Sequence, residues 1–570
     1  MDHRPLRGAR VLLHKQLITA ARKTALRDNS AHATDIPRLD TFLPIHSVTL
    51  RVEFRKPAPT FAGFRSVPLP DTPPKTMPPA HPFDTSYLTD AGDDDKLKEE
   101  CGIFGVVGVA DASNFVALGL HALQHRGQEA GGIVTHDIEA GFQSARRFGY
   151  VRDNFTSQKV METLPGSLGI GHVRYSTSGT KGQTAIRDVQ PFFGEFAMGG
   201  AAIAHNGNIT NANALRRELI ERGSIFQSSS DSECIIHLMA RSLQQTIPER
   251  MEDALRRVEG AFSIVAMTRT KLIGVRDPLG VRPLVLGKLG DGYALSSETC
   301  ALDIIGAEFV REIEPGEMVV INENGVQSHF PFRPQPSKFC IFEHVYFSRP
   351  DSILGGRSVY ETREAIGREL AKENPIEADL VCPVPDSGTP AAIGYGLESG
   401  IPYAMGIIRN QYMGRTFIEP TESIRNMGVR LKLNVNRALV KGKRIILVDD
   451  SVVRGTTSRK IKEMILDAGA AEVHFRIASP PTAWPCFYGV DTPDRDKLLA
   501  ATMSEDEMRD HLGVDSLKFI SLDGLYRAVG EAEGRKKSCP QYCDACFSGE
   551  YPVVPADKVQ DGFVMKPAAE

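Results

Sequence analysis

Two short apolar runs along the chain predict buried β-strands. Residues 101–108 read Cys-Gly-Ile-Phe-Gly-Val-Val-Gly, an apolar run interrupted by glycines, which is typical of a buried strand. Residues 445–448 are four consecutive apolar side chains and predict a strand buried on both faces, as in a parallel sheet. A stretch with helical spacing begins at Ser458 and meets a glycine stop at Gly469. The second run therefore predicts a strand followed by a helix.

A third segment repeats this alternation of strand, loop and helix. From Leu380 the sequence predicts a strand, then the turn-rich loop Pro-Asp-Ser-Gly-Thr-Pro, then a helix through residues 391–396. Loops at the carboxyl ends of strands are where such α/β sheets bind ligands. This loop is therefore a candidate binding loop.

Composition narrows the class of protein. The chain has 570 residues, which suggests about three to four domains. Hydrophobic residues make up 41% and charged residues 24%, as in soluble globular proteins. A net charge of −4 gives no general attraction to nucleic acid or membrane surfaces, and no run reaches the roughly 18 to 20 apolar residues of a membrane span. Nine scattered cysteines fit a reducing compartment better than a disulfide framework, so a cytoplasmic location is expected.

The first hundred residues differ from the rest. Residues 1–50 are rich in Arg and His, and residues 56–82 hold nine prolines, which disfavour regular structure. An acidic run at 90–95 follows. We expect residues 1–100 to be a dispensable leader or linker. A plastid or mitochondrial transit peptide, or a start codon assigned too far upstream, remains an alternative.

Four polar motifs accompany the first predicted strand. They read His121-Ala-Leu-Gln-His-Arg-Gly-Gln-Glu-Ala-Gly-Gly, which ends a helical stretch in glycines, then Gly171-His-Val-Arg-Tyr-Ser-Thr, Ala204-His-Asn-Gly-Asn-Ile and Ser228-Ser-Ser-Asp-Ser-Glu. In this order they resemble the glutaminase domain of the N-terminal-nucleophile amidotransferases, over residues 101 to about 330. The resemblance implies that Cys101 is the nucleophile.

The chemistry of glutamine hydrolysis explains these residue types. A thiolate attacks the amide, and passes through an oxyanion and a thioester to release ammonia. A free cysteine has a pKa near about 8.5 and needs a base, which an α-amine with a pKa of roughly 8 on the same residue could be. That amine exists only if the bond between Glu100 and Cys101 is cut, so we expect the leader to be removed.

The resemblance also implies roles for the other motif residues. Asn206 and Gly207 would form the oxyanion hole through a side-chain amide and a backbone N–H. Arg174 would bind the α-carboxylate of glutamine, and Asp231 its α-ammonium group. Without the resemblance, Arg174 would be interpreted as part of a surface salt bridge and Asp231 as a helix cap.

A phosphate site is expected between the strand at 445–448 and its helix. Backbone N–H groups and hydroxyls at a helix N-terminus face an anion, and these residues are Arg454, Gly455, Thr456 and Thr457. The pair Asp449-Asp450 cannot hold phosphate, because like charges repel, but it can bind ribose hydroxyls and help to hold Mg²⁺.

This segment resembles the phosphoribosyl pyrophosphate (PRPP) motif of the type I phosphoribosyltransferases. The implied PRPP contacts are Asp386, Ser387, Gly388, Thr389, Arg415, Asp449, Asp450, Ser451, Arg454, Gly455, Thr456 and Thr457. One Mg²⁺ would lie among Ser387, Asp449 and Asp450. The residues from Arg409 resemble the family's mobile loop that closes over PRPP, with Arg415 as a charge clamp; the alternative for Arg415 is an exposed loop arginine.

The cysteines outside the nucleophile suggest a cofactor. Cys543 and Cys546 form a C-x-x-C pair, which alone fits zinc, a redox dithiol or an iron–sulfur cluster. Resemblance to an iron–sulfur-containing branch of the family implies one structural [4Fe-4S] cluster per subunit, with ligands Cys340, Cys486, Cys543 and Cys546. Cys539 lies close enough to substitute for one ligand. Cys234, Cys300 and Cys382 stand in apolar stretches and are expected to be packed side chains.

Together the two resemblances imply membership of the amidophosphoribosyltransferase family. The implied fold is an α+β glutaminase domain with αββα layers, joined to an α/β domain with a parallel sheet. The implied segments are a leader at 1–100, a glutamine amidotransferase domain at 101–335, a phosphoribosyltransferase domain at 336–505 and a helical segment with cluster cysteines at 506–570.

The implied reaction converts PRPP, glutamine and water to 5-phosphoribosylamine, glutamate and pyrophosphate, the first committed step of purine synthesis. Purine nucleotides as feedback inhibitors and a homodimer or homotetramer are further implications. The rival functions are a glutamine–fructose-6-phosphate aminotransferase, which would need a sugar-isomerase half, and a PRPP-sensing regulator without catalysis.

Overall fold

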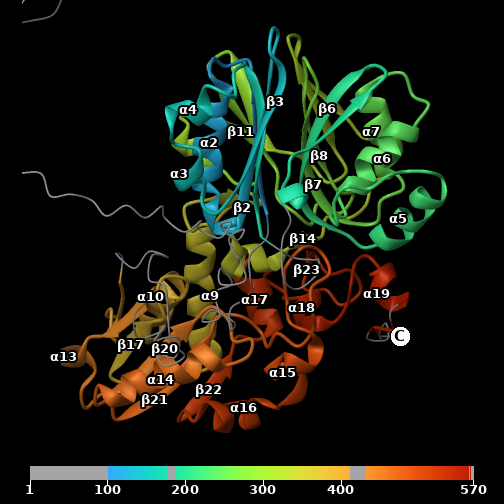
Figure 1. Ribbon diagram of the computed structural model, residues 1–570. Helices are drawn as coiled ribbons and strands as arrows, with labels where there is room; N and C mark the ends of the chain where they lie inside the picture. Colours follow the sequence, from blue (N-terminus) through green and yellow to red (C-terminus); the bar gives the residue numbers. More distant parts are fainter. Residues whose placement is uncertain (1–100, 176–185, 411–431, 561, 564, 566–570) are drawn as a thin grey trace, which may run out of the picture. The chain divides into compact units, whose positions relative to one another are not determined.

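Two β-sheets packed face to face form the first half of the described chain (Figure 1). The computed structural model describes residues 101–175, 186–410, 432–560, 562, 563 and 565. Within residues 101–335, every pair of neighbouring strands in the two sheets is antiparallel. The predicted strand at 101–108 is confirmed as β1 (Gly102–Val107).

The first sheet has seven strands and the second has six. In sheet order the first contains β11 (Glu308–Glu312), β9 (Val285–Leu289), β10 (Gly292–Ser296), β1, β4 (Leu168–Arg174), β2 (Ala130–Asp137) and β3 (Gly141–Phe148). The second contains β13 (Gly325–His329), β12 (Met318–Asn322), β8 (Leu272–Arg276), β7 (Gly260–Met267), β6 (Gly199–Ile209) and β5 (Phe192–Phe196). Ile103, Ile170 and Val265 lie in the apolar layer between the sheets.

Helices cover the outer face of each sheet (Figure 1). On the first sheet these are α2 (Ala112–Ala122), α3 (Val151–Asn154), α4 (Gln158–Met161) and α8 (Cys300–Ile304). On the second they are α5 (Ala212–Glu221), α6 (Glu233–Arg241) and α7 (Ile247–Leu255). These layers confirm the αββα fold.

A four-stranded parallel sheet forms the second half, as predicted. Its order is β17 (Leu380–Pro383), β20 (Arg444–Asp449), β21 (Glu472–Ile477) and β22 (Ser516–Phe519). The helices of this half are α9 (Val359–Glu373), α10 (Thr389–Ser399), α13 (Arg437–Val440), α14 (Thr456–Asp467), α15 (Leu499–Thr502), α16 (Glu505–Leu512), α17 (Leu522–Ala528), α18 (Ala545–Ser548) and α19 (Ala556–Gln560).

Short elements complete the described chain. They are the strand pairs β14 (Phe339–Cys340) with β23 (Tyr542–Cys543), β15 (Ile353–Leu354) with β16 (Arg357–Ser358) and β18 (Ile407–Arg409) with β19 (Leu433–Val435), and the turns η2 (Gln124–Arg126), η3 (Ile186–Asp188), η4 (Glu343–Phe347) and η5 (Arg495–Lys497).

Three details of the prediction differ from the structure. Strand β22 lies within residues 506–570, which were predicted to be helical, because Leu517 and Phe519 alternate with polar residues and face the core. Helix α14 begins two residues before Ser458, since Gly455 takes a left-handed conformation with φ of 77° and ends the preceding loop. The glycines at 131 and 132 lie inside β2 rather than at a helix end, and a Cβ on Gly132 would meet the Gln190 carbonyl oxygen at 2.1 Å.

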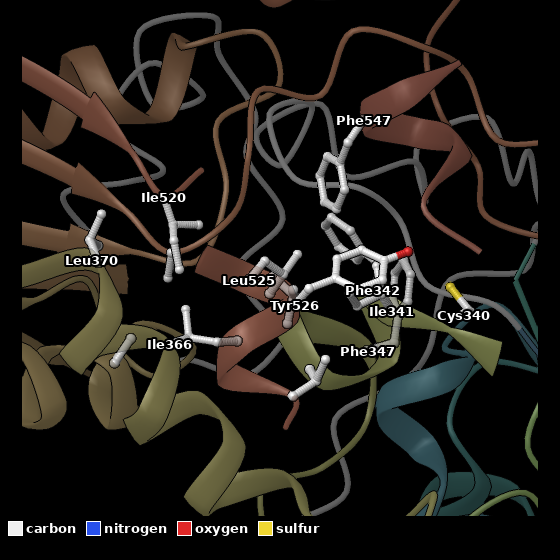
Figure 2. Close-up of a cluster of buried hydrophobic side chains, with 14 of the residues drawn as sticks. Cys340, Ile341, Phe342, Phe347, Ile366, Leu370, Ile520, Leu525, Tyr526 and Phe547 are labelled. Atoms are coloured by element: carbon white, nitrogen blue, oxygen red, sulfur yellow. The ribbon is translucent and has the colours of Figure 1, made fainter. Parts of the chain in front are cut away.

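An apolar cluster around η4, α9 and α17 fills the second half (Figure 2). Figure 2 shows Ile366 and Leu370 of α9 near Leu525 of α17, with Cys340 at the margin of the cluster. The same cluster includes Val281 from the first half, so the two halves share buried apolar surface.

The close packing of α9 against α10 predicts a stability effect. A Cβ on Gly367 would meet the Ala391 carbonyl oxygen at 1.9 Å, so Gly367→Ala must push the two helices apart. We expect the free energy of unfolding to fall by about 1–3 kcal/mol, as for other overpacked sites. Gly131→Ala is the control, because its nearest atom would lie at 3.5 Å. Urea midpoints equal in both variants would contradict this packing.

Candidate functional site

The nucleophile predicted at Cys101 lies at the start of β1, beside Arg174. Strand β1 pairs with β4, and Gly102 stands opposite Val173, so the next residues in each strand, Cys101 and Arg174, come together. The Cys101 thiol donates to the Tyr175 carbonyl oxygen across 3.7 Å. Burial raises the pKa of the Cys101 thiol to about 11, although the Arg174 cation acts in the opposite direction. The thiol therefore needs a base before it can act as a thiolate at neutral pH.

The oxyanion donors predicted at Asn206 and Gly207 lie on β6. Asn206 is fully buried, and neither its amide nitrogen nor its amide oxygen has a hydrogen-bond partner among the described residues. A buried amide without a partner is costly, which favours a ligand that completes its hydrogen bonds. Gly207 has φ of 141°, and a Cβ there would meet the Ala261 carbonyl oxygen at 2.1 Å. This position therefore requires glycine.

Arg174 is not a surface salt bridge, the interpretation expected without the resemblance. Its side chain is buried, and one guanidinium nitrogen donates to the Asp188 carbonyl oxygen. Its Nε has no hydrogen-bond partner among the described residues. A buried guanidinium with donor capacity left over is suited to binding a carboxylate.

Asp231 is held by backbone groups rather than by an arginine. Its Oδ2 accepts from the N–H of Ile209 at 2.9 Å, and its Oδ1 accepts from the N–H of Ser232 at 2.7 Å. The first contact ties Asp231 to the end of β6, three residues after Asn206. The carboxylate predicted to bind an ammonium group is thus fixed to the strand that carries the predicted oxyanion donors.

A buried polar network behind the site was missed by the sequence prediction. His205 Nδ1 lies 2.8 Å from Ser232 Oγ, and the Gln190 amide oxygen accepts from the His205 N–H at 2.7 Å. His172 Nε2 lies 3.2 Å from the His205 carbonyl oxygen and so connects β4 to β6. Burial lowers the pKa of both histidines, so they are neutral at pH 7. The histidines stand inside two of the quoted motifs, which was the available signal.

The acidic pair predicted to bind PRPP lies at the carboxyl end of β20. Asp449 and Asp450 are buried, and Ser387 Oγ donates to Asp450 Oδ1 at 2.6 Å. Ser451 Oγ donates to Asp450 Oδ2 at 2.8 Å. The structure thus brings together Ser387 from the loop after β17 and the pair after β20, because these parallel strands are neighbours.

Glycines allow the two binding loops to approach the sheet. A Cβ on Gly388 would meet the Val448 carbonyl oxygen at 2.3 Å, so the loop before α10 requires glycine there. Thr456 and Thr457 are the first residues of α14, where helix N–H groups face outward.

Two further predicted PRPP contacts lie elsewhere. The Asp386 carboxylate accepts a hydrogen bond from Arg409 across 2.6 Å at the surface, and Arg415 lies outside the described residues.

The four predicted cluster ligands line one cavity. Cys340 on β14 and Cys543 on β23 are direct neighbours in a parallel pair, and Cys486 and Cys546 complete the set. Burial raises the pKa of Cys340 to about 12, and the pKa values of Cys543 and Cys546 also lie well above normal, chiefly through burial and then through the neighbouring cysteines. No set of three or more His, Cys, Asp or Glu side chains in the described ranges is arranged to hold a metal ion.

The remaining cysteines lie apart from this cavity. Cys539 is exposed and lies 3.6 Å from the Lys338 ammonium group. Cys234, Cys300 and Cys382 are buried among apolar residues, which confirms that they are packed side chains. A separate cavity of about 640 Å³ lies at the β2–β3 hairpin, and none of the predicted site residues lines it. No helix in the part of the chain that the structure describes has the length and apolarity to cross a membrane.

The sandwich with its cysteine and the parallel sheet with its acidic pair define a class, the glutamine amidotransferases that carry a phosphoribosyltransferase domain. A family model described as a glutamine amidotransferase domain matches residues 174–303. An amidophosphoribosyltransferase of Rhizobium etli is 54% identical over 488 residues, which cover 85% of this chain and 97% of that protein. A chloroplastic amidophosphoribosyltransferase of Arabidopsis thaliana is 48% identical, covering 84% of this chain and 83% of its own length.

A solved structure agrees with these sequence comparisons. The glutamine PRPP amidotransferase from B. subtilis, complexed with ADP and GMP, superposes with a TM-score of 0.74 at 44% identity, and the match covers 80% of this chain and 97% of that chain. This chain belongs to the amidophosphoribosyltransferase family. The family predicted from the motifs is confirmed, and neither rival function is favoured.

The raised pKa of the Cys101 thiol gives a pH-dependent prediction for the full chain with Met1 attached. Since burial raises the pKa of Cys101 to about 11, its thiolate is rare at neutral pH and becomes more abundant as pH rises. Alkylation of Cys101 by iodoacetamide should therefore accelerate about tenfold per pH unit from pH 7 to pH 10. Peptide mass spectrometry would follow it, with the exposed Cys539 as the control for reagent activity. A plateau at pH 9 would contradict the prediction.

Proposed function

We propose that this chain converts PRPP, glutamine and water to 5-phosphoribosylamine, glutamate and pyrophosphate, the first committed step of purine synthesis. The observation that carries this function is the buried amide of Asn206, which has no hydrogen-bond partner within the described part of the chain and lies on β6, a strand in contact with β1, in the same chain as the Asp449-Asp450 pair. The first site has the groups for releasing ammonia from an amide. The second has the groups for binding a sugar phosphate.

In the glutaminase half, the Cys101 sulfur attacks the amide carbon of glutamine, and ammonia leaves as the thioester forms. The Asn206 amide and the Gly207 N–H donate to the developing oxyanion, at a contribution of roughly 3 to 4 kcal/mol for such a donor. Arg174 binds the α-carboxylate, and Asp231 binds the α-ammonium group. Removal of residues 1–100 supplies the α-amine that takes the thiol proton, which lowers the barrier set by the buried thiol.

In the second half, Asp449 and Asp450 accept hydrogen bonds from the ribose hydroxyls. Backbone groups of residues 386–389 bind the pyrophosphate, while Ser451 and residues 454–457 bind the 5-phosphate at the N-terminus of α14. The oxygens of Ser387, Asp449 and Asp450 fit Mg²⁺, which supplies charge neutralisation to the pyrophosphate when bound. Arg415 acts as a charge clamp on PRPP in this proposal, and exclusion of water from the site lets ammonia rather than water attack the sugar.

Cys340, Cys486, Cys543 and Cys546 hold a structural [4Fe-4S] cluster in this proposal. Four cysteines on one buried cavity are the donor set for such a cluster. A single tetrahedral zinc would require sulfurs only about 3.8 Å apart, from a Zn–S bond of about 2.3 Å, and the cysteines are not arranged for a single ion. When bound, the cluster would supply a covalent connection among three distant segments, those of Cys340, Cys486 and the Cys543–Cys546 pair.

We further propose that purine nucleotides inhibit the enzyme and that it forms a homodimer or homotetramer. The B. subtilis structure bound to ADP and GMP supports the first point. All nine cysteines are free, which supports a reducing compartment and the cytoplasm. The chloroplastic relatives support plastid import by the leader as the alternative.

Replacing the nucleophile tests whether glutamine hydrolysis and the use of ammonia occur at separate sites. Cys101→Ala should reduce glutamine-dependent synthesis of phosphoribosylamine by roughly 10³-fold or more, because no thioester can form. Synthesis from added ammonium chloride at pH 8.5 should stay within about twofold of the wild-type rate, because the second site is intact. Cys234→Ala is a control for the loss of a buried thiol. Glutamine-driven synthesis that survives in Cys101→Ala would overturn the mechanism.

The cluster proposal is tested by single cysteine replacements. Cys486→Ser should lower the iron and sulfide bound per chain by about half or more after anaerobic purification, since the thiolate is a ligand. Cys539→Ser, the matched control outside the cavity, should retain the wild-type iron content. Elemental analysis and visible absorption would measure both. Equal iron in the two variants, or none in the wild type, would refute the ligand set.

A further inference from the structure

Asn208 connects the oxyanion strand to the loop that carries Cys486. Its side-chain amide donates to the Phe487 carbonyl oxygen at 2.9 Å, and Phe487 directly follows Cys486. Asn208 lies on β6, two residues after Asn206 and one after Gly207. The two ends of this hydrogen bond are 279 residues apart in the sequence. The loop that carries Cys486 is therefore in direct hydrogen-bond contact with β6.

Hydrogen bonds among residues that line the cavity hold the loop that carries Cys486. The Cys486 N–H donates to Thr492 Oγ1 at 2.7 Å, and the Tyr488 N–H donates to Cys486 Sγ at 3.4 Å. Tyr488 also accepts at its hydroxyl from the Val553 N–H at 3.0 Å. Because Cys486 is surrounded by these contacts, the position of its sulfur and the direction of the Phe487 carbonyl are linked.

A second connection runs from Cys340 to the other side of the glutaminase site. Glu343, three residues after Cys340, binds Arg282 at 2.9 Å and Arg126 at 2.6 Å, and all three side chains are buried. Arg282 also lines the four-cysteine cavity. Arg126 precedes Gly127, where a Cβ would meet the backbone of Arg174 at 2.7 Å. The cavity is thus connected through contacts to β6, which carries Asn206, and to Arg174 at the end of β4.

We propose that Asn208 is a positioning residue, which makes glutamine hydrolysis at Cys101 depend on an intact four-cysteine centre. This inference rests on the proposed function. It states that the four-cysteine centre controls the alignment of Asn206 and Gly207. With the Phe487 carbonyl in place, β6 holds the oxyanion donors in their catalytic direction. When the cysteines are no longer held together, the loop shifts and the donors lose alignment, while the PRPP site keeps its own support from β17 and β20.

The isosteric change Asn208→Asp tests this step, because it removes the amide donor and keeps the shape of the side chain. We expect kcat for glutamine hydrolysis to fall about 10- to 100-fold with KM changed by less than about threefold, as for a small misplacement of catalytic groups. Iron per chain, emission of Trp484 and synthesis from ammonium chloride should match the wild type. Trp484 is the only tryptophan, and its backbone N–H donates to the Cys546 carbonyl oxygen at 3.1 Å, so its emission reports on the loop that carries Cys546.

Asn211→Ala is the matched control, since its amide donates to the Arg257 carbonyl oxygen at 3.0 Å, away from the cavity. It should retain the wild-type kcat. Two outcomes would overturn the proposal: kcat of Asn208→Asp within threefold of the wild type, or iron content and ammonia-dependent synthesis that fall together with kcat. If the wild-type enzyme showed no ammonia-dependent synthesis, the proposed function itself would be refuted. This outcome is different from the two outcomes that would overturn the role of Asn208 alone.

Loss of iron supplies the second test, with a readout other than turnover. Alkylation of Cys101 by a diazoketone analogue of glutamine should slow about tenfold in wild-type protein as air removes its iron. In Asn208→Asp the reaction should be slow from the start and should slow no further. Equal further slowing in both proteins would show that the cavity acts on Cys101 by another route and would overturn the role of Asn208.

Discussion

A set of buried charges joins the two halves of the described chain, and it includes Arg126, whose neighbour Gly127 packs against the backbone of Arg174. Glu298 and Glu343 are fully buried, and each forms an ion pair with Arg126, while Arg282 pairs with Glu343. Removing one partner of such a set typically costs about 3–5 kcal/mol, because the remaining charge is left in a medium that solvates it poorly. The neighbouring arginines hold the pKa of Glu343 at about 2 despite its burial, so it stays ionised across the physiological range. These ion pairs therefore persist across the physiological pH range and do not act as a pH switch.

The sequence predicted the parts of the structure that follow from local patterns. Strands β1 and β20, the helix after Gly455 and the parallel sheet follow from apolar runs and glycine stops, while the αββα layers followed from the family resemblance of the motifs. The proximity of Ser387 to Asp450 was implied by the family resemblance, and the structure explains it, because β17 and β20 are adjacent parallel strands whose following loops lie at the same end.

The parts that were missed depend on distant contacts. The glycines at 131 and 132 have the pattern of a helix end, and only the position of the Gln190 carbonyl explains why glycine is needed at 132. The four-residue strand β22 is too short for its alternation to stand out. Glu343 and Asn208 are ordinary polar residues in sequence, and their partners lie 217 and 279 residues away. No local pattern distinguishes such residues from solvated ones.

The four-cysteine cavity explains why these distant contacts occur where they do. Its four cysteines come from three segments of the second half, spread over 207 positions from Cys340 to Cys546, and Val281 and Arg282 of the first half complete its lining. The complete cavity therefore forms only when the two halves are packed together. A group bound there would contribute its binding free energy to that docked arrangement, because the unfolded chain cannot form the site. The contacts of Asn208 and Glu343 begin beside two of the ligands and end beside the glutamine site. Under the role proposed for Asn208, a centre that takes no part in the reaction would thereby affect the geometry of the predicted oxyanion donors Asn206 and Gly207.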